Sequence, residues 1–252
     1  SVITENDVFH YRGGGVVICH GVITNCMIYN NEASYGGGGI YGYADPYDGY
    51  QVRMTDCLIY DNRAGDAYRS GIGGGCDLAG NVVLEHCVIS NNWANGLGGG
   101  VTGDRDVVFV DCVIEDNWAG DSGGGVRGGT AIDCIIQDNW SEGPGGGMSQ
   151  ASAEGCTIQG NIAFLNDGGG LFDVNATNCI VRANEAENGG GVYSFGDNVL
   201  ENCLIYNNSA YFDGGGVCSG LVYNCTVADN IATSGGGVFG GSVYNSIVYY
   251  NS

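Results

Sequence analysis

A repeat that pairs cysteine with asparagine runs through the chain and constrains its fold more than any other feature. Nine cysteines mark the copies: Cys26, Cys57, Cys87, Cys112, Cys134, Cys156, Cys179, Cys203 and Cys225. An asparagine stands five residues after each of them: Asn31, Asn62, Asn92, Asn117, Asn139, Asn161, Asn184, Asn208 and Asn230. At the ends serine replaces cysteine, so that Ser1 leads to Asn6 and Ser246 leads to Asn251. The spacing of 21–31 residues identifies an internal repeat, which has to be interpreted before anything else.

The copies share one consensus: Asn or Asp, Cys, any residue, Ile or Val, two residues, Asn, any residue, Ala (Ser141 in one copy), a loop, and Gly-Gly-Gly before an apolar residue that is most often Val or Ile. The pattern contains three short strand-like segments: the one after the cysteine, the one after the glycines, and a third such as 199–202. None is long enough to form a domain alone, and no apolar period of 3.6 residues indicates helices. Stacked copies share one core, so the repeat predicts a parallel β-solenoid.

The recurring asparagines and cysteines are expected to form two internal ladders. Side chains alternate between the faces of a strand, which turns the cysteine and the Ile or Val two residues later into the coil. We interpret the asparagine as a turn residue in left-handed backbone, whose amide bonds its own backbone and the amide of the next coil. Stacked cysteines lie about one strand spacing apart, more than the ~3.8 Å between Cβ atoms that a disulfide prefers, which predicts free thiols. Three cysteines, Cys19, Cys76 and Cys218, lie outside this column.

With Ile-x-x-Asn followed by Gly-Gly-Gly-Ile, as at 28–31 and 37–40, the repeat resembles that of the polymorphic outer-membrane protein family of autotransporter passengers. That family repeats Phe-x-x-Asn and Gly-Gly-Ala-Ile, so here Ile or Val replaces Phe, a third glycine replaces Ala, and cysteine is added. The resemblance covers essentially the whole chain. It implies a right-handed parallel β-helix outside the cell, used in adhesion or surface display, and it implies no catalytic residue.

The prediction for the fold is therefore an all-β chain, a right-handed parallel β-helix of about ten coils of 21–31 residues with internal Asn and Cys ladders. One domain is expected to span residues 1–252, uncapped at both ends. At about 4.8 Å per coil, the rod would be on the order of 50 Å long.

Charge narrows the classes of partner. The chain has 28 acidic residues, seven arginines and no lysine, for a formal net charge of -21. Nucleic acid is an unfavourable partner, because phosphate binding depends on clustered cations. The absence of lysine also argues against a phosphate-loop interpretation of the glycine runs. No stretch of about 18 apolar residues predicts a transmembrane helix.

Aromatic residues supply the candidate ligand-binding positions. Trp93, Trp118 and Trp140 follow the repeat asparagine in three consecutive copies, which predicts an exposed aromatic strip. Such a strip suits glycan binding or stabilises the edge of the solenoid. The longest insertion, 41–55, carries Tyr43, Tyr47 and Tyr50 and is expected to project from the second coil.

An acidic residue that recurs before the repeat asparagine has two interpretations, a calcium ligand or a turn residue, and the first is the weaker. The residue before the asparagine is an acid in four copies and could offer carboxylates to calcium, although turn residues are the favoured explanation. These positions are Asp61, Asp116, Asp138 and Asp229. Neither a metal site nor another cofactor is assigned.

An apolar row faces outward. The residue after each cysteine should point to solvent, yet it is mostly aliphatic: Met27, Leu58, Val88, Val113, Ile135, Thr157, Ile180, Leu204 and Thr226. Such a stripe indicates either strand propensity and cover by a loop, or packing against another chain. Bare ends would also allow stacking end to end.

Two functions follow from these features. The first is a non-enzymatic extracellular structural solenoid that self-associates into a surface fibre or acts as an adhesin-type module. The alternative is a carbohydrate-binding or polysaccharide-degrading β-helix protein. Catalytic residues are not assigned, because the scattered arginines and acids form no recognisable site for glycan cleavage.

Overall fold

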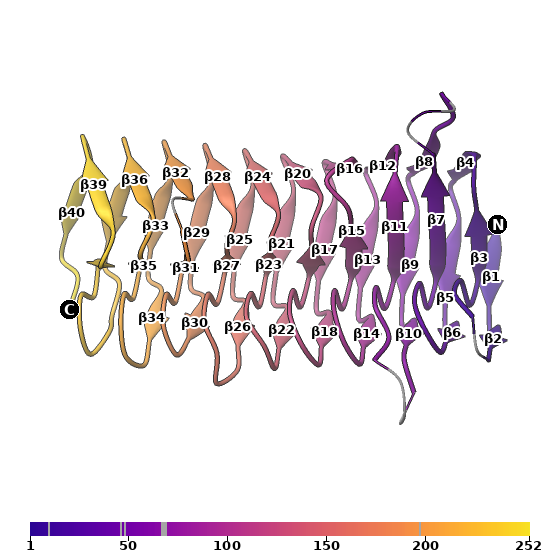
Figure 1. The fold of residues 1–252 in the computed structure, drawn as a ribbon, viewed down its shortest axis with the longest axis horizontal. Helices are drawn as coiled ribbons and strands as arrows, with labels where there is room; N and C mark the ends of the chain where they lie inside the picture. The colour runs from indigo at the N-terminus through magenta and orange to yellow at the C-terminus, as the bar shows by residue number, and fades with distance from the viewer. Residues whose placement is uncertain (10, 46, 48, 67–69, 197) are drawn as a thin grey trace.

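The computed structural model describes residues 1–9, 11–45, 47, 49–66, 70–196 and 198–252. The described chain winds through ten complete coils and begins another, and like positions lie above one another along a straight rod (Figure 1). Every ladder between coils is parallel, and the strands form four sheets. This arrangement confirms the predicted all-β solenoid.

The strands of the first sheet, here called the cysteine sheet, begin one residue after each repeat cysteine, or after Ser1 and Ser246 at the ends. Its register places core Ile or Val residues over one another, such as Ile114 over Ile136, while the residues on either side face outward. Its strands are β1 (Val2–Thr4), β5 (Met27–Tyr29), β9 (Leu58–Tyr60), β13 (Val88–Ser90), β17 (Val113–Glu115), β21 (Ile135–Gln137), β25 (Thr157–Gln159), β29 (Ile180–Arg182), β33 (Leu204–Tyr206), β37 (Thr226–Ala228) and β40 (Ile247–Tyr249).

A second sheet, the asparagine sheet, was not among the three segments expected from the sequence. Its strands contain two residues each, too few for a period of two to be recognised. The second residue is usually a buried alanine, which lets the coil bend tightly. The strands are β2 (Asp7–Val8), β6 (Glu32–Ala33), β10 (Arg63–Ala64), β14 (Trp93–Ala94), β18 (Trp118–Ala119), β22 (Trp140–Ser141), β26 (Ile162–Ala163), β30 (Glu185–Ala186) and β34 (Ser209–Ala210).

The glycine sheet follows the Gly-Gly-Gly runs, which lie in close backbone contact. A Cβ added to Gly99 would lie 2.4 Å from the carbonyl oxygens of Gly124 and Trp118, so only glycine fits. The strands are β3 (Val16–Ile18), β7 (Ile40–Ala44), β11 (Cys76–Gly80), β15 (Val101–Gly103), β19 (Val126–Arg127), β23 (Met148–Ser149), β27 (Leu171–Phe172), β31 (Val192–Tyr193), β35 (Val217–Cys218) and β38 (Val238–Phe239).

The return sheet closes each coil and supplies the largest core side chain, Phe109. Side chains from the cysteine, glycine and return sheets form one continuous apolar core inside the rod. The strands are β4 (Gly21–Thr24), β8 (Val52–Thr55), β12 (Val82–Glu85), β16 (Val107–Val110), β20 (Thr130–Ile132), β24 (Ser152–Glu154), β28 (Asn175–Thr177), β32 (Val199–Glu201), β36 (Leu221–Tyr223) and β39 (Ser242–Tyr244).

Left-handed backbone occurs beside the repeat asparagines rather than at them, which corrects the expectation from sequence. The residue before each one carries the positive φ, as at Asn91 (φ 53°), because the turn is made one residue before the inward-facing amide. The recurring acids Asp61, Asp116, Asp138 and Asp229 occupy this position with φ of 54–55°. They are turn residues, as the favoured interpretation held.

Candidate functional surfaces

The asparagine ladder is unbroken from Asn6 to Asn251. Each side-chain Nδ2 donates to the Oδ1 of the asparagine in the next coil at 2.8–3.0 Å. The backbone N–H of the same residue donates to that oxygen at 2.9–3.2 Å. Such chained amides polarise one another in a buried setting. The ladder is therefore structural, as predicted.

The second side-chain proton of most ladder asparagines has a different acceptor from the one expected. In the middle of the rod, Nδ2 donates to a core carbonyl of the preceding coil, as Asn92 does to Ile59 at 2.9 Å, rather than to its own backbone. Donation to the preceding coil recurs from Asn31 to Asn251. Four asparagines near the ends of the rod also donate to their own backbone two residues earlier, as expected from the sequence: Asn6, Asn31, Asn208 and Asn251. Each asparagine from Asn31 to Asn230 thus ties together three successive coils.

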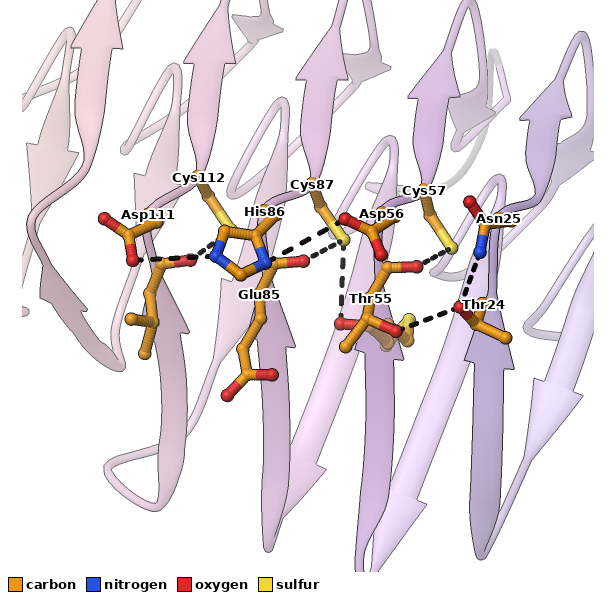
Figure 2. A network of polar contacts seen from close by, with 12 residues as sticks. Thr24, Asn25, Thr55, Asp56, Cys57, Glu85, His86, Cys87, Asp111 and Cys112 are labelled. Atoms are coloured by element: carbon orange, nitrogen blue, oxygen red, sulfur yellow. Dashed lines mark hydrogen bonds and ion pairs between the residues drawn. The ribbon is translucent and has the colours of Figure 1, made fainter.

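The cysteine column consists of free thiols, and the three cysteines outside it are free as well. Each column Sγ donates to the carbonyl two residues earlier at 3.1–3.3 Å, as Figure 2 shows for Cys57 and Cys87. Neighbouring thiols and burial raise the pKa of Cys134, and burial raises that of Cys76. Raised pKa values keep Cys76 and Cys134 protonated, so these two thiols act as packing groups rather than nucleophiles. Hydrogen bonds with neighbouring thiols instead lower the pKa of Cys87 and Cys225.

A row of polar side chains lies at the corner before the cysteines, where the repeat usually has Asn or Asp (Figure 2). His86 lies between two carboxylates, with Nδ1 3.9 Å from Asp56 and Nε2 3.8 Å from Asp111. The three residues share a positive φ, which explains the recurring Asn and Asp before cysteine. Their side chains are more than half exposed, so the row contributes little to stability.

The three tryptophans form the predicted strip, but their ring faces are covered. Trp93 stacks on Trp118 with centroids 4.8 Å apart, and Trp118 stacks on Trp140 at 5.6 Å. The guanidinium of Arg63 covers Trp93 at 4.2 Å, and Phe164 lies against Trp140 at 5.5 Å. Sugars bind aromatic side chains through the ring face. This geometry therefore favours an edge-stabilising role for the strip.

The tyrosine insertion is shorter than the sequence suggested. Most of 41–55 belongs to β7 and β8, which extend the sheets, and only 45–51 connects them. Tyr43 lies on β7, whereas Tyr47 (94% exposed) and Tyr50 lie in the connection, with Tyr50 5.3 Å from the His20 ring. Tyr43 belongs to the glycine sheet and the tryptophans belong to the asparagine sheet, so the structure does not combine the two groups in one site.

The apolar stripe lies on the outer face of the cysteine sheet, as predicted. Equivalent positions pair along it, from Met27 with Leu58 to Leu204 with Thr226. The exposed fraction is 38–41% at Met27, Leu58, Ile135, Ile180 and Leu204, and the intervening positions are partly buried. The stripe is thus a mostly aliphatic surface along the rod, interrupted by Thr157 and Thr226.

An aromatic pocket near the N-terminus was not found from the sequence. Tyr11, Tyr35, Tyr41, Val17 and Arg12 line a hollow of about 450 Å³. The guanidinium of Arg12 lies 5.2 Å from the Tyr41 ring centroid. Only tertiary contacts bring these residues of the first two coils together.

Arg12 is held in this pocket by a buried acid. It donates to Asp77 at 3.0 Å, and the hydroxyl of Thr102 donates to the other carboxylate oxygen at 2.9 Å. Burial raises the pKa of Asp77, while both partners act in the opposite direction. A positioned guanidinium beside tyrosine rings can bind sugar hydroxyl groups.

Within the described ranges, no group of three or more His, Cys, Asp or Glu side chains is arranged to hold a metal ion. The same part of the chain contains no helix long and apolar enough to cross a membrane. Neither finding assigns a cofactor or a location.

Comparison with known proteins identifies the family. A family model described as the right-handed beta helix region matches residues 1–172 and, in a second overlapping match, residues 100–252. A search of curated proteins found no match. The two family matches together span every coil described above. The chain therefore belongs to the right-handed β-helix family.

Proposed function

We propose that the chain is a non-enzymatic structural rod, displayed outside the cell, that works through its side surface as an adhesin-type module or by lateral self-association into a fibre. The resemblance of its repeat to that of the polymorphic outer-membrane proteins supports this role. The observation that carries the proposal is the mostly aliphatic stripe that follows the outer face of the cysteine sheet along the rod.

The stripe is mostly aliphatic, as protein interfaces often are, and it runs along the length of the rod. Aliphatic groups stand at this position in all coils except those with Thr157 and Thr226, and neighbouring positions are separated by one strand spacing. Apolar surface that extends over such a length is typical of protein contacts. The stacked asparagines hold the coils in register, so the surface is rigid and little conformational entropy is lost on binding.

Three substitutions that copy residues of the chain itself test this proposal. The changes Ile135→Thr, Ile180→Thr and Leu204→Thr introduce the residue that two other positions of the stripe, Thr157 and Thr226, already carry. Sedimentation velocity and electron microscopy should show concentration-dependent association of the parent and a monomeric triple variant.

A matched control lies on the outer face of the return sheet, where Thr130 pairs with Val108. The changes Val83→Thr, Val108→Thr and Val199→Thr remove the same kind of group and should leave association unchanged. A parent that stays monomeric at high concentration, or a stripe variant that associates equally well, would contradict self-association through the stripe.

Carbohydrate binding is a second candidate, favoured by the pocket around Arg12. Calorimetric titration with neutral oligosaccharides should show binding that Tyr11→Ala and Arg12→Gln weaken, whereas Tyr47→Ala tests the projecting connection. Release of reducing ends or of unsaturated products in the same mixtures would instead indicate glycan cleavage. If none of the three variants changes binding, the pocket is not the site.

A further inference from the structure

Unequal loops create a groove over the eighth coil. Between the ladder asparagine and the glycine run, the seventh coil has six residues (162–167), the eighth has four (185–188) and the ninth has five (209–213). The loop after β26 reaches further from the rod than the one after β30 (Figure 1). Because coils repeat at about 4.8 Å, the two longer loops stand roughly 10 Å apart, enough for one extended chain.

The walls of this groove are exposed apolar side chains. Phe164 and Leu165 form one wall and Tyr211 forms the other, with exposed fractions of 50%, 67% and 71%. They enclose a hollow of about 210 Å³ with Glu185 and Ala186 at its floor. A second hollow of about 340 Å³ adjoins it across Tyr211.

Two of the residues that form these walls, Phe164 and Tyr211, are held in place by contacts with their neighbours. Phe164 rests against Trp140 at 5.5 Å, so one side of its ring is covered by the tryptophan strip and the rest faces away from it. Tyr211 lies edge-on to Phe212 at 4.6 Å, and its carbonyl accepts a hydrogen bond from Thr233 at 2.7 Å. A site prepared in this way loses less entropy when it binds.

Leu165 adopts a backbone conformation that leucine seldom occupies. Its φ is +54°, in the left-handed region where glycine and asparagine are the usual residues, and the side chain is mostly exposed. Packing inside this chain does not account for the choice of leucine. Strained backbone at an exposed apolar residue points to a role in binding.

The charge of the groove indicates what it binds. Its only charged lining residues among those the structure describes are Glu185 and Glu187, beside the aliphatic groups of Ile162, Ala163 and Ala186. We propose that this groove binds a short basic peptide segment. One apolar side chain of the peptide sits between Leu165 and Tyr211, and a lysine or arginine beside it pairs with Glu185 and Glu187.

Peptide binding is independent of the stripe, which lies on another sheet. The probe is the capped pentapeptide Gly-Lys-Leu-Lys-Gly, titrated into ¹⁵N-labelled full chain. Saturable amide shifts should be confined to 162–165, 185–187 and 209–211. The matched probes Gly-Glu-Leu-Glu-Gly and Gly-Lys-Ser-Lys-Gly should bind more weakly.

Substitutions separate the two parts of the site. Leu165→Asn keeps a residue suited to left-handed backbone and should raise Kd about tenfold through loss of apolar contact. The double variant Glu185→Gln and Glu187→Gln should raise Kd about fivefold, as expected for two exposed ion pairs. The controls Glu154→Gln and Glu201→Gln remove the same charge from the return sheet and should change Kd less than twofold.

Several outcomes would overturn the proposal. Shifts spread evenly over the acidic surface would mean nonspecific charge attraction, and equal binding of the acidic probe would remove the role of the glutamates. Saturation of the same amides by neutral cellohexaose, but not by the lysine peptide, would make the groove a glycan site instead. The triple stripe variant should bind the peptide like the parent, which keeps this test separate from the test of self-association.

Discussion

Asn117 donates two hydrogen bonds to one atom of Asn139: its backbone N–H and its side-chain Nδ2 both lie 3.0 Å from Oδ1. The remaining Nδ2 proton goes to the carbonyl of Ile89 in the preceding coil at 2.9 Å. One buried side chain therefore satisfies backbone groups that the turn would otherwise leave unpaired. The stability of the rod should depend on this relationship at every coil.

Adjacent asparagines allow a matched test of the ladder. Asn92→Asp removes the two donations of a fully buried amide and places a carboxylate against acceptor oxygens, so it should lower the free energy of unfolding by about 3 kcal/mol or more. Asn91→Asp makes the same chemical change at an exposed corner, and the equivalent position of the next coil is already an acid, Asp116. The free energy of unfolding of this variant should stay within about 0.5 kcal/mol of the parent value. Denaturant unfolding measures both, and equal effects would contradict the ladder.

Thiol accessibility should follow burial. In the native protein, maleimide should modify Cys19, which is exposed, before any buried cysteine. After denaturation without reductant, all twelve thiols should react. Mass spectrometry counts the adducts, and fewer than twelve after unfolding would reveal disulfides that the structure does not contain.

The effect of replacing a glycine by alanine on stability should depend on the space available for the added Cβ atom. Gly99→Ala would place a methyl group 2.4 Å from two carbonyl oxygens and should cost more than about 2 kcal/mol of stability. Gly196→Ala meets no atom within 4 Å and should be neutral or slightly stabilising. Urea unfolding of the two variants provides the comparison. A mild effect of Gly99→Ala would mean that the coils can separate there.

Stability should rise as the pH falls from neutral towards about 4. Burial raises the pKa of Asp77, and burial with nearby Glu115 and Asp138 raises that of Asp116, so the folded state binds protons more readily than the unfolded chain. The contribution of these two carboxyl groups to the free energy of unfolding is fully present below their pKa in the unfolded chain. It is lost as the pH rises through their higher pKa in the folded state. The net charge of -21 acts in the same direction.

Asp77→Asn tests the main group in this effect. Unfolding free energies from pH 8 to pH 4 should increase less steeply in this variant than in the parent. Asp229→Asn, which removes a carboxylate at an exposed corner, should keep the parent's slope. An unchanged slope in Asp77→Asn would mean that its burial does not control the pH dependence.

The tryptophan strip should act as a structural stack. Trp118→Ile copies Ile162 from the same row and should lower stability by about 1 kcal/mol through loss of ring stacking. Oligosaccharides should leave tryptophan fluorescence unchanged, because the ring faces are covered. Saturable quenching by a sugar, abolished in Trp118→Ile, would restore the glycan-binding interpretation.

Much of the architecture was predictable because the chain repeats. Asparagine recurs five residues after cysteine, so correct register stacks each type on itself, and the ladder, the thiol column, the tryptophan stack and the apolar stripe follow. Two features were not predictable from the pattern. The strands of the asparagine sheet, such as Trp93–Ala94, have only two residues, which is too few for alternation of apolar and polar residues to be recognised. The left-handed residue of the turn was predicted at the asparagine, one position after the residue that adopts this conformation.

The sequence alone determined the periodic part of this protein, because a residue that recurs in every coil can only meet its own copies. Only the tertiary structure decided the parts that do not recur. The groove between Leu165 and Tyr211 arises from differences in loop length, and the pocket of Arg12 depends on Asp77, 65 residues away. Such contacts join positions that share no pattern, so their geometry is set by the packing of particular side chains.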